Sequence, residues 1–113
     1  ALQQDPFLAK VMELVTANIE SADLNVKMLY TEMGMSRAQF FRKIKSISTL
    51  SPNKIVMNIR MNLASEMLRQ GTMNVSEVAY RTGFSDPAYF SKVFKSVYDV
   101  SPINYQKKYA KNK

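Results

Sequence analysis

One pattern occurs twice in this chain, and it constrains the fold more than any other feature. The pattern begins with Asn-Val, continues with Gly-x-Ser, a Phe and a Lys-Ser pair, and ends with Ser-Pro. It spans residues 25–52 in the first copy and 74–102 in the second. The matching serines are 49 residues apart and the matching phenylalanines 50, so the second copy has gained one residue near Asp86. A repeat of this period with an insertion at a turn indicates a duplicated structural unit.

Helical spacing of apolar residues, with Asn, Ser, Asp or Pro at the expected starts, continues along the chain. No segment alternates between apolar and polar residues, so strands are not expected. The predicted helices span about residues 6–20, 26–33, 37–48, 52–70, 75–82, 87–97 and 102–110. The sequence therefore predicts an all-α fold with two helix-turn-helix subdomains of about three helices each, joined by a long central helix.

Glycines stand where each copy must turn from one helix into the next. Gly34 and Gly83 both fit a position of positive φ, which glycine adopts without a Cβ clash. Ser36 follows the first glycine and is placed to cap the next helix. Asn74 and Glu77 have the spacing of a capping box in the second copy.

The helix after each glycine has one apolar stripe. We expect Phe40, Ile44 and Ile47 to be buried in the first copy. Phe90, Phe94 and Val97 are expected to be buried in the second. The remaining positions of both helices are then available to a ligand.

The pattern divides the chain into three parts. Residues 1–51 hold an N-terminal helix and the first helix-turn-helix, 52–70 the linker helix, and 71–113 the second helix-turn-helix with a basic tail. The linker helix is apolar on several sides, which indicates burial between partners. At about 1.5 Å per residue it would be roughly 28 Å long.

Composition argues against enzymatic chemistry. The chain has no Cys and no His, so it lacks thiolate ligands, disulfides and the commonest catalytic base. The nine carboxylates are scattered without a paired motif. We expect no catalytic residue, metal or other cofactor. No apolar stretch reaches the length of a membrane span, so no membrane partner is expected. The start at Ala1 without Met suggests a fragment of a longer protein.

Positive charge is concentrated after residue 24. The formal charge is +7, but residues 1–24 are acidic, and the rest carries fifteen Lys and Arg against five acids. Such a surface attracts polyanions. A helix-turn-helix places its second helix in the DNA major groove, so duplex DNA is the leading partner. A basic helical module that binds an acidic protein, or a non-specific binder of RNA or membrane surfaces, is the alternative.

The residues expected to contact DNA follow from side-chain type and position on the helices at 37–48 and 87–97. Arginine can pair with guanine and glutamine with adenine, while Phe41 suits a thymine methyl group. The candidate base contacts are Arg37, Ala38, Gln39, Phe41, Arg42, Ala88, Tyr89, Ser91 and Lys92. The candidate phosphate contacts are Ser36, Lys43, Lys45, Ser85 and Lys95. The second helix has fewer cations, so we expect fewer direct base contacts there.

Residues 75–95, closing with Val100-Ser101-Pro102-Ile103-Asn104-Tyr105, strongly resemble the signature of AraC/XylS-type regulators. Residues 60–68 resemble the linker helix of that family, and residues 36–43 its first recognition helix. The resemblance covers about residues 24–109. It implies a bacterial, cytoplasmic transcription regulator whose two recognition helices enter successive major grooves on one face of the duplex. It also implies RNA polymerase as a partner and a preceding sensor or receiver domain, in a one-component or hybrid two-component regulator.

Overall fold

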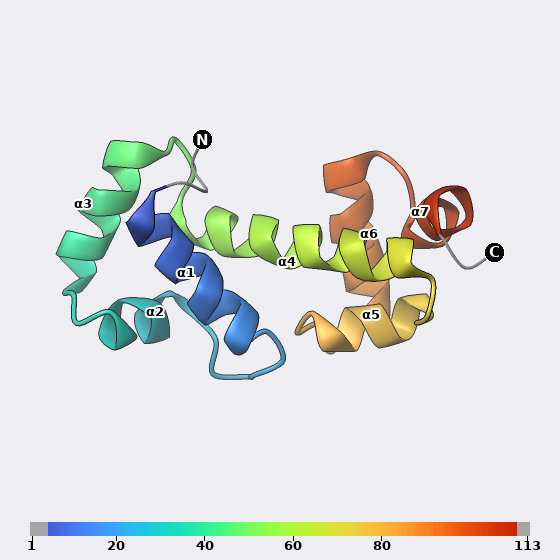
Figure 1. Ribbon diagram of the computed structural model, residues 1–113, viewed down its shortest axis with the longest axis horizontal. Helices are drawn as coiled ribbons and strands as arrows, with labels where there is room; N and C mark the ends of the chain where they lie inside the picture. Colours follow the sequence, from blue (N-terminus) through green and yellow to red (C-terminus); the bar gives the residue numbers. More distant parts are fainter. Residues whose placement is uncertain (1–4, 111–113) are drawn as a thin grey trace. The chain divides into compact units, whose positions relative to one another are not determined.

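The computed structural model describes residues 5–110 and contains helices joined by short loops, with no strand among those residues (Figure 1). The helices are α1 (Pro6–Ala17), α2 (Val26–Glu32), α3 (Arg37–Ile47), α4 (Pro52–Gln70), α5 (Val75–Arg81), α6 (Pro87–Tyr98) and α7 (Pro102–Tyr109). The predicted all-α class is confirmed. Lys111 and Lys113 of the predicted basic tail lie outside the described residues.

Side-chain caps fix most helix starts. Asp5 accepts a hydrogen bond from the Phe7 N–H, and Asn25 accepts one from the Met28 N–H. The capping box predicted from Asn74 and Glu77 is present at the start of α5. The first helix is three residues shorter than predicted, because Asn18 forms its C-cap and donates from Nδ2 to the Leu14 carbonyl.

The chain forms two compact units. Unit 1 ends at Ile59 and unit 2 begins at Arg60, so the boundary lies inside α4. The two halves of α4 bury different positions, which explains why its apolar residues do not form one stripe. The buried apolar residues of α4 are Ile55, Val56 and Ile59 in unit 1, and Met61, Ala64 and Leu68 in unit 2. The three-part division at residues 51 and 70 stays a prediction.

Apolar packing forms the core of unit 1. Phe40 is almost completely buried in α3, and its ring lies 5.5 Å from that of Phe7 and 6.1 Å from that of Tyr30. The other buried apolar residues outside α4 are Leu8, Val11, Val15, Leu24, Leu29 and Ile44. The side-chain hydrogen bonds described within this unit join residues no more than four apart.

Aromatic rings form the core of unit 2. Phe94 lies 5.9 Å from Phe90, 4.6 Å from Tyr98 and 5.2 Å from Tyr105, measured between ring centroids. The ring of Phe84 extends this chain to within 5.2 Å of Phe90. The aromatic area that these rings remove from water contributes to the stability of the unit.

Side-chain hydrogen bonds between distant residues also connect unit 2. Arg60 donates to the Thr82 carbonyl, and burial lowers the pKa of its guanidinium. Arg69 donates to the Tyr105 hydroxyl at 2.8 Å. Gln106 donates to the Met73 carbonyl at 2.7 Å. These bonds join the second half of α4 and the loop after it to the rest of the unit.

The predicted stripe of α6 is wrong at its last position. Val97 is 44% exposed, while Tyr98 packs on Phe94 and donates from its hydroxyl to the Met61 carbonyl at 3.2 Å. At 3.6 residues per turn, either residue could follow Phe94 on the buried face. The larger ring with a hydroxyl partner takes that place. In α3, Ile44 is buried as predicted, and Ile47 is half-buried.

Candidate nucleic-acid interface

The turns between α2 and α3 and between α5 and α6 share one hydrogen-bond pattern. Gly34 has φ 66° and Gly83 has φ 90°, as the sequence predicts. The N–H of the residue after each glycine donates over 2.9 Å, Met35 to the Tyr30 carbonyl and Phe84 to the Ala79 carbonyl. The backbone of the motif is therefore repeated even where a tyrosine stands in the place of an alanine.

The inserted residue lies in the second turn, as predicted. Ser36 caps α3 two residues after Gly34, whereas Asp86 caps α6 three residues after Gly83. Pro87 then occupies the first position of α6, where its missing N–H costs no hydrogen bond. Each recognition-helix candidate thus starts at a firmly capped N-terminus.

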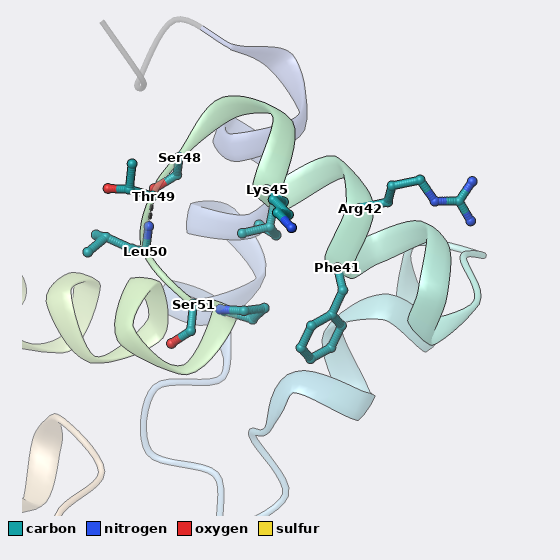
Figure 2. Close-up of a pocket in the computed structure, with 9 residues that line it drawn as sticks. Phe41, Arg42, Lys45, Ser48, Thr49, Leu50 and Ser51 are labelled. Atoms are coloured by element: carbon teal, nitrogen blue, oxygen red, sulfur yellow. Dashed lines mark hydrogen bonds between the residues drawn. The ribbon is translucent and has the colours of Figure 1, made fainter.

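The candidate base contacts of unit 1 lie together on the solvent side of α3. Arg37, Ala38, Gln39 and Arg42 are exposed, and Phe41 is half-buried. The Arg37 guanidinium lies 4.2 Å from the centre of the Phe41 ring, a cation–π contact along one helix face. The Arg42 side chain extends away from the protein (Figure 2).

Gln39 also has a structural role that the prediction missed. Its Oε1 accepts a hydrogen bond from the Ser36 N–H at 2.8 Å, while the Ser36 hydroxyl accepts one from the Gln39 N–H at 3.1 Å. This is a capping box, and the Ser-x-x-Gln spacing was a signal that could have revealed it. Pairing with adenine uses both ends of a glutamine amide, so it would compete with this cap.

The candidate base contacts of unit 2 line the start of α6. Ala88, Tyr89 and Lys92 are exposed, and Ser91 is half-buried. Tyr89 is 54% exposed, and its ring lies 6.0 Å from that of Phe84. The side of α6 that faces solvent thus offers one cation and one phenol in its first two turns.

The candidate phosphate contacts are all exposed. Ser36 and Ser85 lie in the two turns, while Lys43, Lys45 and Lys95 lie on the helices that follow. The Lys43 ammonium lies 5.9 Å from the centre of the Phe7 ring. Each unit thus places hydroxyl or ammonium donors beside its candidate base contacts.

A hollow beside α3 was not predicted. It has a volume of about 690 Å³ and lies between the end of α3 and the loop before α4 (Figure 2). Phe41, Arg42 and Lys45 line it from the helix, and residues 48–52 line it from the loop and the start of α4. Its shape depends on the conformation of the loop at residues 48–51, which no periodic pattern in the sequence specifies.

Within residues 5–110 no group of three or more carboxylate, His or Cys side chains is placed to hold a metal ion. In that same part of the chain, no helix combines the length and the apolar character that crossing a bilayer requires.

The sequence matches the helix-turn-helix domain family over residues 29–108. It is 36% identical over 104 residues to the HTH-type transcriptional regulator MtrA of Neisseria gonorrhoeae, a match covering 92% of this chain and 34% of that protein. It is 32% identical over 106 residues to the Histidine kinase P4 of Formosa agariphila, covering 94% of this chain and 8% of that protein. The chain therefore spans only about a third of the first of these relatives and less than a tenth of the second.

Solved structures with the same fold include an AraC-type DNA-binding regulator from Chromobacterium violaceum, at a TM-score of 0.84 and 26% identity, covering 96% of both chains. The DNA-binding domain of AdpA, solved with a target DNA, has a TM-score of 0.79 and 26% identity, covering 94% of both chains. The C-terminal domain of the response regulator AraT from Geobacillus stearothermophilus has a TM-score of 0.80 and 25% identity, covering 94% of this chain and 88% of that one.

Proposed function

The chain belongs to the AraC-type helix-turn-helix family, whose domains bind DNA sequence-specifically in transcription regulation, and we propose that α3 and α6 are its recognition helices. Each helix would enter a major groove of its own. The observation that carries this proposal is the repeated turn: the same 2.9 Å backbone hydrogen bond after Gly34 and after Gly83 leads into a capped helix with an exposed first turn.

Arg42 is the main base-contacting residue in this proposal. Its guanidinium extends from the exposed face of α3, and a bidentate pair with guanine contributes about 1–3 kcal/mol of discrimination. Arg37 is held over the Phe41 ring, so we assign these two side chains a joint contact, in which the ring covers a thymine methyl and the guanidinium reaches the next base. Ala38 and Gln39 complete the base-facing turn.

The contacts of α6 are weaker in base preference. Lys92 and Ser91 can donate hydrogen bonds, Ala88 can pack on a thymine methyl, and Tyr89 offers an exposed ring with a hydroxyl. None of these groups forms the two parallel hydrogen bonds of an arginine with guanine. Unit 2 therefore contributes affinity more than selectivity.

Phosphate contacts by Ser36, Lys43 and Lys45 in unit 1, and by Ser85 and Lys95 in unit 2, would fix the position of each helix in its groove. Because three of these residues are lysines, binding should weaken steeply as salt rises.

Binding-site selection from random duplex DNA tests the proposal. We expect one preferred sequence with two separated blocks of conserved bases, the sharper block belonging to α3. Affinity for that duplex, measured by fluorescence anisotropy, should fall linearly with salt on a double-logarithmic plot. Equal binding to all sequences would instead support a non-specific nucleic-acid binder, and no binding to DNA would favour a basic protein-interaction module.

The whole protein is a cytoplasmic transcription regulator in this proposal, and its role is binding rather than catalysis. The relatives extend well beyond the matched region, and one structural neighbour is the C-terminal domain of a response regulator. A sensor or receiver domain before this one, and contact with RNA polymerase at a promoter, complete the proposed role. Transcription in vitro from a promoter carrying the selected site, with and without the full protein, tests the polymerase contact.

A further inference from the structure

The hollow beside α3 is lined by groups that suit an anion with an apolar portion. Its apolar lining comes from Phe41, Ile44, Leu50 and Pro52. Arg42 and Lys45 also line it, with the Arg42 guanidinium extending away from the loop (Figure 2), and no carboxylate is among its lining residues. An apolar surface beside cations and without acids fits neither a cation nor a purely apolar guest.

Hydroxyl groups complete the lining. Ser48 Oγ accepts a hydrogen bond from the Leu50 N–H at 3.0 Å, and Ser51 Oγ accepts one from the Lys54 N–H at 3.2 Å. Both oxygens act as acceptors toward the backbone, so both O–H protons remain available to an outside acceptor. Thr49 is exposed between them on the same loop.

The loop is held in place by bonds that do not depend on a ligand. The Ser48 N–H donates to the Ile44 carbonyl at 2.9 Å and ends α3, and the Ile55 N–H donates to the Ser51 carbonyl at 3.0 Å. The loop between these bonds presents the 38% exposed Leu50 side chain. In a DNA strand, sugars that can be covered by an apolar side chain alternate with phosphates that accept hydrogen bonds. The loop offers the exposed Leu50 for the first and hydroxyl donors for the second.

We propose that this hollow is a seat for one DNA strand, in which Ser48, Thr49 and Ser51 hold a backbone phosphate with Lys45 while Leu50 covers the neighbouring sugar. The proposal rests on the function proposed above, since Phe41 and Arg42 line the hollow and are also candidate base contacts of α3. It extends the DNA contact of unit 1 from α3 to the loop at residues 48–51.

Unit 2 provides a matched comparison. By the repeat, Tyr98 and Asp99 stand at the positions of Ser48 and Thr49. Tyr98 is packed on Phe94, and Asp99 adds a negative charge in a left-handed conformation with φ 61°. A carboxylate at this position repels a phosphate, so the seat belongs to unit 1 alone.

The test uses the intact chain, the duplex chosen by site selection, and versions of it with one phosphate replaced by a neutral methylphosphonate. Thr49→Val, which keeps the shape and removes the hydroxyl, should weaken binding about 3- to 10-fold on every sequence, as expected for a phosphate contact. Thr49→Asp should weaken it more and lower the salt dependence. Asp99→Asn changes the charge by one unit outside the hollow, and it should leave unchanged the methylphosphonate effects beside the block contacted by α3.

The decisive readout is coupling. One methylphosphonate position flanking the block contacted by α3 should weaken the wild type but have little further effect on Thr49→Asp. Circular dichroism and thermal melting check that the variants are folded. If Thr49→Val and Thr49→Asp bind DNA with wild-type affinity and retain every methylphosphonate effect, the proposed strand seat is wrong. The proposal that α3 and α6 are recognition helices would not be affected. If those variants bind DNA normally and a small amphipathic carboxylate raises the melting temperature of the wild type but not of Thr49→Asp, the hollow belongs to a soluble ligand and the strand seat is wrong.

Discussion

Units 1 and 2 share a backbone motif and differ in how the motif is held. Unit 1 packs around Phe40 with local side-chain hydrogen bonds, and its exposed α3 carries the two arginines. Unit 2 packs a chain of aromatic rings and adds hydrogen bonds between residues 22 to 38 positions apart, such as Arg60 to Thr82 and Gln106 to Leu68. In the proposed function the duplicated turn supports base selection in unit 1, whereas in unit 2 it belongs to a core joined by hydrogen bonds between distant residues.

The largest expected difference between the units is in the free energy of unfolding lost when a core residue is truncated. Phe94 and Ile44 are both buried and occupy the same position of the repeat. Phe94→Ala should lower the free energy of unfolding by about 3–5 kcal/mol, because it removes a ring that contacts three others. Ile44→Ala, with fewer atoms removed, should cost about 2–4 kcal/mol. Urea denaturation followed by circular dichroism measures both. A larger loss for Ile44→Ala would show that the core of unit 1 is the firmer one.

Base selection is the second test of the comparison. Arg42→Ala should weaken binding to the selected duplex about 10- to 100-fold and relax the preference at one base pair. Lys92→Ala, at the matching position of α6, should weaken binding to all duplexes nearly equally. Site selection repeated with both variants measures this. Loss of a preferred base with Lys92→Ala alone would reverse the roles of the two helices.

The glycines of the two turns give a smaller effect. A Cβ at Gly34 would meet no atom within 4 Å, so Gly34→Ala should cost only the left-handed conformation, about 1–2 kcal/mol. At φ 90°, Gly83 lies further from the left-handed helical region, so Gly83→Ala should cost more. Thermal melting compares the two, with Gly34→Asn as the control that tolerates positive φ. Equal melting temperatures for Gly34→Ala and the wild type would contradict the strain argument.

The smallest effect tests the caps of α2 and α5. Asn25 and Asn74 both cap, but Glu77 completes a capping box where Met28 stands in the first repeat. Glu77→Met should therefore lower the free energy of unfolding by about 0.5–1 kcal/mol, the net contribution of one hydrogen bond. Met28→Glu should raise it by a similar amount, because it completes a capping box in unit 1. Denaturant titrations of the single variants and of the pair measure this. No gain from Met28→Glu would mean that the start of α2 is shaped by its neighbours rather than by its cap.

The sequence predicted what local chemistry decides. Helix starts depend on one side chain and the next few backbone N–H groups, so the caps at Ser36 and Asn74 were predicted correctly. The positive φ of Gly34 and Gly83 follows from their place in the repeat.

The features that the sequence did not predict depend on residues distant in the chain or on loop geometry. The packing of the half-buried Tyr98 in the place predicted for Val97 involves the Met61 carbonyl, 37 residues away. The hollow beside α3 depends on the path of residues 48–51, which no periodic pattern specifies. The capping role of Gln39 at the start of α3 could have been predicted from its spacing to Ser36. It was missed because a glutamine at this position also suits a contact with adenine. The residues assigned to bases and phosphates stay predictions.

The boundary inside α4 has a consequence for dissecting the protein. The repeat period is 49 to 50 residues, but unit 1 extends to Ile59 and uses the buried Ile55 and Val56. The two units therefore divide one helix between them, and a cut before residue 52 would deprive unit 1 of the part of α4 that it buries. Fragments designed for separate expression should both contain residues 52–70, so that their combined length exceeds that of the parent chain.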